Sequence, residues 1–103
     1  MFIAMNRFQV KLGQEQEFER IWRERDILLR DEPGFVEFHL LKGPQREDHT
    51  LYSSHTIWSS KETFEGWTRS DAFRKAHQNA GQHKGLYIGG PNFEGFEVVQ
   101  HVK

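Results

Sequence analysis

Residues 14–30 repeat apolar side chains at helical spacing, and strand-like segments lie on both sides of this stretch. The spacing of three, four and seven positions is typical of a helix with one buried face. The sequence DEPGF follows, and its turn chemistry predicts that the helix ends near residue 30. The apolar side chains on this stripe are Phe18, Ile21, Trp22, Leu28 and Leu29.

The rest of the chain reads as short strands and short helices. Hydrophobic runs bounded by turn residues predict strands, and the polar stretch GPQREDH predicts a hairpin between the second and third of them. Serines at 59, 60 and 70 are N-cap signals for two helices. The expected elements are strands at 2–10, 35–42, 50–58 and 93–102 and helices at 14–30, 59–67 and 71–80.

This order is βαββαβ, which predicts an α+β, ferredoxin-like fold: an antiparallel sheet with its helices on one face. The 103 residues suffice for one core, so we expect a single domain spanning residues 1–103. The opposite face of the sheet would remain bare and apolar. Such a face normally packs against a partner, and a homodimer is the simplest prediction.

Composition excludes several classes of function. With 14 basic and 15 acidic residues the net charge is −1, which argues against nucleic-acid binding and membrane-surface binding. The absence of cysteine excludes disulfides and zinc–thiolate sites. The first ten residues lack the pattern of a signal peptide, and no apolar run could cross a membrane. We therefore expect a cytoplasmic protein.

His77 lies on the inward face of the helix expected at 71–80, beside Phe73, Ala76 and Ala80 at helical spacing. A hydrogen-bonded core histidine would explain it. A metal ligand, a haem ligand or a general base would also fit. Zinc or non-haem iron would need further converging ligands, and His83 falls on a different face; haem iron needs only one.

Asn6 interrupts an otherwise apolar strand face, because alternation places it with Phe2, Ala4, Phe8 and Val10. Its amide either bonds neighbouring backbone or is a donor aimed at a ligand.

Arg25 falls on the apolar stripe of the helix expected at 14–30. It either extends its stem over apolar surface or meets a carboxylate at a pocket rim. Trp58 and Trp67 fit the core, although Trp67 could also lie beside a flat ligand.

No phosphate-binding loop, dinucleotide fingerprint or nucleophile elbow is present. The glycine-containing stretch 81–92 is expected to be a loop, and its apolar Leu86, Tyr87 and Ile88 suggest a lid that folds over a ligand.

Together, NRF in the first strand, PGF before the second, WSSKETFEGW and SDAFRKAH resemble the antibiotic-biosynthesis-monooxygenase superfamily, and within it the IsdG-type haem-degrading monooxygenases. The likeness runs from Phe2 to about Val102. PGF and WSSKETF are common to members that bind no haem, whereas the combination of Asn6, Trp67 and His77 is the discriminating part.

The resemblance implies a role for each of these residues. His77 matches the proximal, axial ligand of the haem iron. Asn6 matches an amide that donates a hydrogen bond toward the iron-bound oxygen or the pyrrole plane, and Trp67 matches an indole that crowds and distorts the macrocycle. Arg25 falls near a position that pairs with a propionate in some relatives, and the companion basic position is Ile21 here.

The resemblance also implies a dimeric α/β-barrel and haem as both substrate and cofactor, opened with dioxygen and electrons from an external donor, such as a reductase, with release of iron. Two alternatives remain at this point. A cofactor-independent monooxygenase of quinol or polyphenol substrates would keep His77 in the core. A haem carrier or sensor would bind haem without degrading it.

Overall fold

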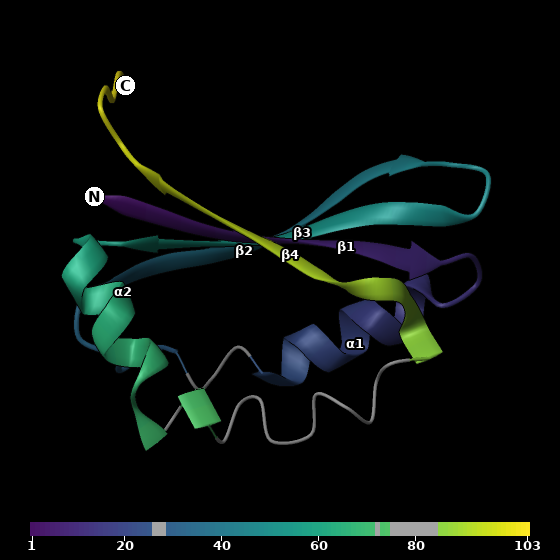
Figure 1. The fold of residues 1–103 in the computed structure, drawn as a ribbon, viewed down its shortest axis with the longest axis horizontal. Helices are drawn as coiled ribbons and strands as arrows, with labels where there is room; N and C mark the ends of the chain where they lie inside the picture. The colour runs from purple at the N-terminus through teal and green to yellow at the C-terminus, as the bar shows by residue number, and fades with distance from the viewer. Residues whose placement is uncertain (26–28, 72, 75–84) are drawn as a thin grey trace.

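The computed structural model describes residues 1–25, 29–71, 73–74 and 85–103, with Arg25 described by its backbone alone. The four strands form one antiparallel sheet in the order β2-β3-β1-β4, and both helices lie against the same face of it (Figure 1). The α+β, ferredoxin-like arrangement predicted from the sequence is confirmed. Along the chain the elements are β1 (Phe2–Lys11), α1 (Glu15–Arg25), β2 (Phe35–Gln45), β3 (His49–Trp58), α2 (Lys61–Thr68) and β4 (Tyr87–Glu97).

The last strand is where the sequence prediction was wrong. β4 begins at Tyr87 and ends at Glu97, whereas we expected a loop up to residue 92 and a strand at 93–102. Gly89, Gly90 and Pro91 form an irregularity opposite Phe8, where the pairing of β4 with β1 shifts between Arg7 and Gln9. Tyr87 and Ile88 pair with β1 and are not part of a lid, and residues 81–84 of the expected loop lie outside the described residues.

The helices are shorter than expected where their ends are described. α1 ends at Arg25, and residues 29–34 form turns, so the helix does not continue to residue 30. The helix expected at 71–80 begins as predicted, since the Ser70 hydroxyl accepts a hydrogen bond from the Phe73 N–H at 3.1 Å; residues 75–80 lie outside the described part of the chain. None of the described helices is long and apolar enough to span a membrane.

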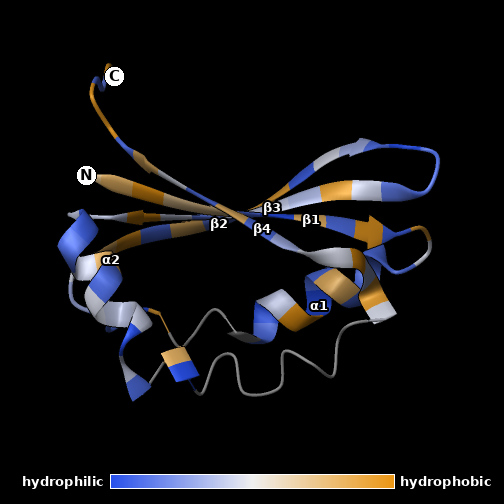
Figure 2. Ribbon diagram, in the orientation of Figure 1, coloured by the Kyte–Doolittle hydropathy of each residue, from blue (hydrophilic) through white to orange (hydrophobic). Residues whose placement is uncertain are grey.

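The core lies between the sheet and the two helices and consists of two aromatic-rich clusters. Apolar and polar positions alternate along the strands (Figure 2), and the even-numbered apolar side chains of β1 are buried on the helix side, as predicted. One cluster is built on Phe2, Ala4, Leu29 and Trp58. The other is built on Phe8, Val10, Phe18 and Tyr52.

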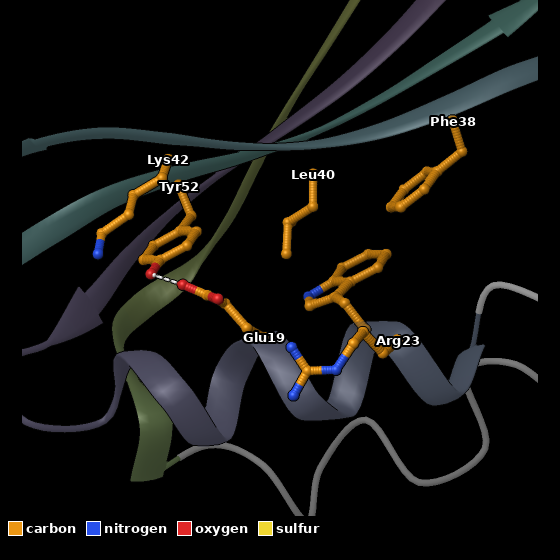
Figure 3. Close-up of a pocket in the computed structure, with 7 residues that line it drawn as sticks. Glu19, Arg23, Phe38, Leu40, Lys42 and Tyr52 are labelled. Carbon is orange, nitrogen blue, oxygen red and sulfur yellow. Dashed lines mark hydrogen bonds between the residues drawn. The ribbon is translucent and has the colours of Figure 1, made fainter.

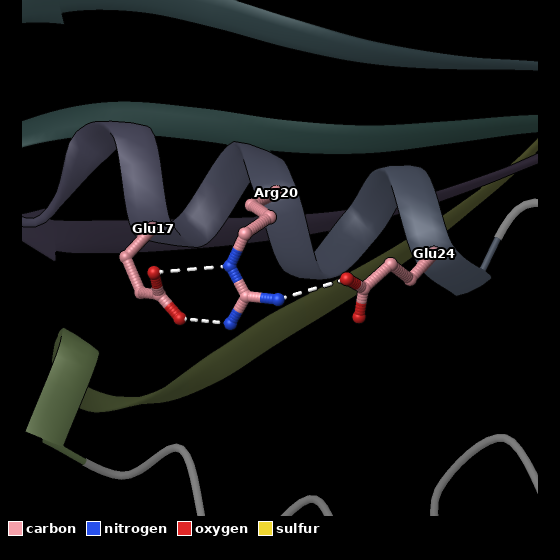
Figure 4. Close-up of polar contacts among 3 residues, drawn as sticks. All are labelled: Glu17, Arg20 and Glu24. Atoms are coloured by element: carbon pink, nitrogen blue, oxygen red, sulfur yellow. Dashed lines mark hydrogen bonds and ion pairs between the residues drawn. The ribbon is translucent and has the colours of Figure 1, made fainter.

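The solvent side of α1 is held by ion pairs. Arg20 bonds Glu17 on the preceding turn and reaches Glu24 on the next at 2.8 Å (Figure 4). The hydrogen bond with Glu17, followed by the charges of both glutamates, raises the pKa of Arg20 above its usual range. These exposed contacts stabilise the helix only modestly, so burial of Phe18 and Ile21 fixes α1 on the sheet.

The opposite face of the sheet carries apolar side chains with an imidazole pair among them. The strand register places Ile3, Met5 and Ile57 on this face. His39 and His55 stack there with ring centroids 5.8 Å apart. Burial, followed by the charge of His39, lowers the pKa of His55, so the neutral imidazole is the favoured form.

The PGF sequence makes the turn that leads into β2, and this turn packs against the start of α2, where the Ser59 N–H donates to the Gly34 carbonyl at 2.7 Å. Gly34 has φ +82°, a left-handed conformation that favours glycine, and a Cβ added there would collide with the side chain of Thr63. Thr63 is itself fixed, because its backbone N–H bonds the Ser60 hydroxyl at 3.2 Å and its own hydroxyl accepts from the Ser60 N–H at 3.3 Å. PGF and the Ser60 cap are therefore one structural unit.

We expect Gly34→Ala to lower the free energy of unfolding by about 2–4 kcal/mol, since backbone strain and a steric clash act together. Gly13→Ala is the matched control: Gly13 has φ +90° with open space around its Cα, so about 1–2 kcal/mol is expected from strain alone. Urea denaturation of both variants measures the difference. Equal losses would mean that Thr63 does not restrict this turn.

Candidate functional site

Asn6 lies at the middle of β1 on the helix side of the sheet, as the alternation predicted. It is half-buried, and its side chain makes no hydrogen bond with the residues that the structure describes. The strand register places it beside Ser54 of β3 and Phe93 of β4, with Leu40 of β2 beyond Ser54. We call Leu40, Ser54, Asn6 and Phe93 the boundary row.

The boundary row separates the two core clusters. Phe2 and Ala4 precede Asn6 on β1 and belong to the first cluster, and Phe8 and Val10 follow it and belong to the second. α2 packs on the first cluster and α1 on the second, so the row lies between the areas that the two helices cover (Figure 1). A polar amide thus lies between two aromatic-rich clusters, on the part of the sheet that neither helix covers.

Trp67 belongs to the aromatic group on the first side of the row. It is half-buried, and its ring centroid lies 5.5 Å from that of Trp58 and 4.8 Å from that of Phe73, edge to face in the second case. Phe64, one turn earlier on α2, stacks on Phe93 of the boundary row with centroids 5.7 Å apart. Trp67 and Asn6 therefore lie in adjoining parts of one surface, joined through Phe64 and Phe93.

Two of the predicted site residues cannot be placed. His77 lies outside the described residues, and so does the side chain of Arg25. Among the residues that are described, no three carboxylate or imidazole side chains gather into a group that could hold a metal ion.

A pocket of about 430 Å³ opens between α1 and β2 at the Leu40 end of the boundary row (Figure 3). Phe38, Leu40 and Lys42 extend toward it from β2, and α1 contributes Glu19 and Arg23. The indole of Trp22 and the ring of Phe38 stack with centroids 5.6 Å apart and planes 15° apart. The complete lining is Glu19, Trp22, Arg23, Phe38, Leu40, Lys42 and Tyr52.

The carboxylate of Glu19 is engaged at one side of this pocket. The hydroxyl of Tyr52, which is 1% exposed, donates a hydrogen bond to Glu19 at 2.5 Å. Burial and this hydrogen bond raise the pKa of Tyr52, so the phenol stays protonated and remains a donor. The two cations of the pocket, Arg23 and Lys42, are exposed and form no ion pair with the described residues.

Several of these residues could not be identified from the sequence. Ser54 is 5% exposed and lies next to Asn6 only because of the strand register. Lys42 and Tyr52 line one pocket for the same reason, since they pair across β2 and β3. Nothing in the local sequence around Lys42 or Tyr52 indicates that these two residues are neighbours.

Comparisons of sequence place these features in a family. The profile described as antibiotic biosynthesis monooxygenase matches residues 1–79. A heme oxygenase of Staphylococcus haemolyticus, named as staphylobilin-producing, is 34% identical over 80 residues, which cover 77% of this chain and 75% of that protein. A heme-degrading monooxygenase of Bacillus thuringiensis is 39% identical over 49 residues, covering 48% and 46% of the two chains.

Comparisons of structure agree on the fold. The heme-degrader MhuD from Mycobacterium tuberculosis, solved with two hemes in its active site, has a TM-score of 0.74 and 27% identity, with 100% of both chains covered. SnoaB, a cofactor-independent oxygenase from Streptomyces nogalater, has a TM-score of 0.71 and 23% identity, with 98% of this chain and 95% of that chain covered. The likeness to SnoaB extends to the fold alone.

We expect Asn6→Val to leave the free energy of unfolding unchanged within about 0.5 kcal/mol or to raise it, because the amide forms no hydrogen bond that would be lost. Thr50→Val is the matched control. Thr50 is 2% exposed and its hydroxyl donates to Glu15 at 2.9 Å, so this variant should lose about 1 kcal/mol. Urea denaturation measures both. A loss at Asn6 as large as at Thr50 would identify a structural amide.

Proposed function

Because the chain belongs to the antibiotic biosynthesis monooxygenase family, we propose from its site and its relatives that it is a haem-degrading monooxygenase. It binds haem as substrate and cofactor and opens the porphyrin ring, which releases iron. Dioxygen and electrons from an external donor, such as a reductase, complete the reaction. The observation that carries this proposal is the half-buried amide of Asn6, which lies between two aromatic-rich clusters and forms no hydrogen bond with the described residues.

The residues at the boundary row fit a haem by their chemistry. A porphyrin is flat and largely apolar, and the aromatic clusters on both sides of Asn6 offer such a ligand a matching surface. The amide of Asn6 has no hydrogen-bond partner among the described residues, so it is available to donate to a bound ligand. When bound, haem supplies an iron centre that reacts with dioxygen.

Asn6 donates its amide N–H toward the oxygen that reacts, or toward the pyrrole plane. Such a donor acts on the developing charge of the reaction more than on binding of the resting substrate. Trp67 crowds the porphyrin and distorts it, and the rings of Trp58 and Phe73 hold the indole in place.

In this proposal His77 would hold the haem iron and Arg25 would pair with a propionate. The assignment of His77 rests on its place in the family pattern SDAFRKAH, and that of Arg25 rests on its position at the end of α1. A neutral imidazole binds iron through one nitrogen, so His77 alone is a sufficient protein ligand.

One competing function is a monooxygenase that needs no cofactor, since SnoaB, which is named as such an oxygenase, has the same fold. A carrier or sensor that binds haem without degrading it would use the same surface. The three possibilities differ in what happens to a haem spectrum, which makes them separable by one measurement.

We expect the purified protein, mixed with haemin and a reductant in air, to show a Soret band that then decays. A stable band would indicate a carrier, and no band would indicate the cofactor-free function. His77→Ala should abolish or greatly weaken turnover while preserving the fold, since alanine favours the helix.

Within the same assay, Asn6→Ala should bind haem normally and degrade it at least about tenfold more slowly. Gln9→Ala is its control, because it removes a similar amide from an exposed position on the other face of the same strand. If Asn6→Ala loses binding and rate equally, the amide holds the substrate and does not act in the reaction.

The proposal includes a homodimer that joins two sheets into a barrel through the face that the helices leave uncovered. The support is the presence of Ile3, Met5 and Ile57 on that face, together with His55, whose Nδ1 is buried without a hydrogen-bond partner in the described part of the chain. A second copy would cover these apolar side chains on both subunits at once.

Sedimentation of the unmodified protein at micromolar concentration should give a dimer. Met5→Lys puts a charge at the middle of the proposed interface and should yield a monomer, because an unpaired ammonium is costly to bury. Gln16→Lys, on the exposed side of α1, adds the same charge elsewhere and should leave the dimer intact. A stable monomer of the unmodified chain would contradict the barrel.

A further inference from the structure

The pocket between α1 and β2 is continuous with the surface proposed for haem. Leu40 belongs both to the boundary row and to the pocket lining. The ring of Trp22 lies 5.7 Å from Phe8 of the second cluster and 5.6 Å from Phe38 of the pocket. Leu40 and Asn6 are two strands apart, about 10 Å at the usual strand spacing, which is within the span of a substituted tetrapyrrole. A ligand centred at Asn6 therefore reaches the pocket with its edge.

The charges of the pocket favour an anionic group. Among the lining residues Arg23 and Lys42 are positive and Glu19 is negative, and Tyr52 already donates a hydrogen bond to Glu19. Glu15, just outside the lining, also attracts Lys42, but its carboxylate is engaged by the hydroxyl of Thr50. Arg23 also differs from Arg20 on the same helix, which is held between two glutamates. Arg23 and Lys42 form no ion pair with the described residues, and the stacked rings of Trp22 and Phe38 line the same pocket. This combination suits a carboxylate that is attached to a flat apolar ligand.

One turn before Arg25 on α1 lies Ile21, which is 8% exposed in the apolar core and offers no charge to a carboxylate. Arg23 and Lys42 are the cations that line the pocket at the Leu40 end of the boundary row.

We propose that the pocket between α1 and β2 receives a propionate of the tetrapyrrole, with Arg23 and Lys42 as its cationic contacts. This inference rests on the proposed function only in that a tetrapyrrole is the ligand. It assigns substrate recognition to one residue on each side of the pocket, Arg23 from α1 and Lys42 from the edge strand β2. The residues of the boundary row act in the reaction itself.

The test uses metal-free protoporphyrin IX, which cannot be held through iron, and its dimethyl ester, which has no carboxylates. Affinity for each is measured by absorbance titration of the full-length protein. Arg23→Gln and Lys42→Gln should each weaken binding of the free acid roughly three- to tenfold and leave binding of the ester unchanged. Glu19→Gln should strengthen binding of the acid, since it removes the opposing charge.

Arg46→Gln is the matched control, because Arg46 is exposed, forms no ion pair with the described residues and lies outside the pocket. It changes the net charge by the same amount and should have no effect. Equal losses for Arg46→Gln and Arg23→Gln, equal losses for acid and ester, or no binding of the acid by the unmodified protein would each overturn the inference. Binding that depends on Arg23 and Lys42, without decay of haem in air, would support it and reject the enzymatic activity.

Discussion

The central strand β1 fixes the geometry of the whole molecule. It is hydrogen-bonded to β3 on one side and β4 on the other, and its even-numbered side chains supply both core clusters. A slip of one residue in either pairing would turn Phe2, Ala4, Phe8 and Val10 away from the helices. Burial of these side chains therefore specifies the register, and the register brings every residue of the boundary row together.

The same constraint explains why a polar group is tolerated in the core. Asn6 cannot leave the helix face without moving its apolar neighbours on β1 outward. The cost of a half-buried amide is small beside the burial of Phe2 and Phe8, which are 5% and 7% exposed. The strand can thus hold a functional hydrogen-bond donor rigidly at a position where burial of an amide is by itself unfavourable. Rigid placement is what a catalytic hydrogen bond requires.

Much of this could be predicted from periodicity and capping. The order of elements, the face of Asn6 and the N-caps at Ser60 and Ser70 all follow from local sequence. The start of β4 could not be predicted, because Gly89, Gly90 and Pro91 have the composition of a loop. They lie opposite Phe8 as an irregularity within a paired strand, and only the pairing partners on either side show this.

The pocket was unpredictable for a different reason. Its lining comes from three separate segments, and Lys42 and Tyr52 share it because of the register between β2 and β3. Local sequence determines whether a residue is in a strand and which face it takes, but it does not determine the neighbour across the sheet. The sequence therefore identified Asn6 and Trp67 as candidates singly, whereas Ser54, Arg23 and Lys42 gained significance only from the fold.

The positions of the tryptophans give the protein an optical property. Trp22 packs with the second cluster, and Trp58 and Trp67 pack with the first, so the indoles stand on both sides of the boundary row. Tryptophan emits light at wavelengths that porphyrins absorb, and energy transfer over such short separations is efficient. A tetrapyrrole bound at the boundary row would quench the fluorescence of all three tryptophans, and opening of its ring would restore part of their emission. The intrinsic fluorescence of the chain is thus a gauge of occupancy that needs no added label.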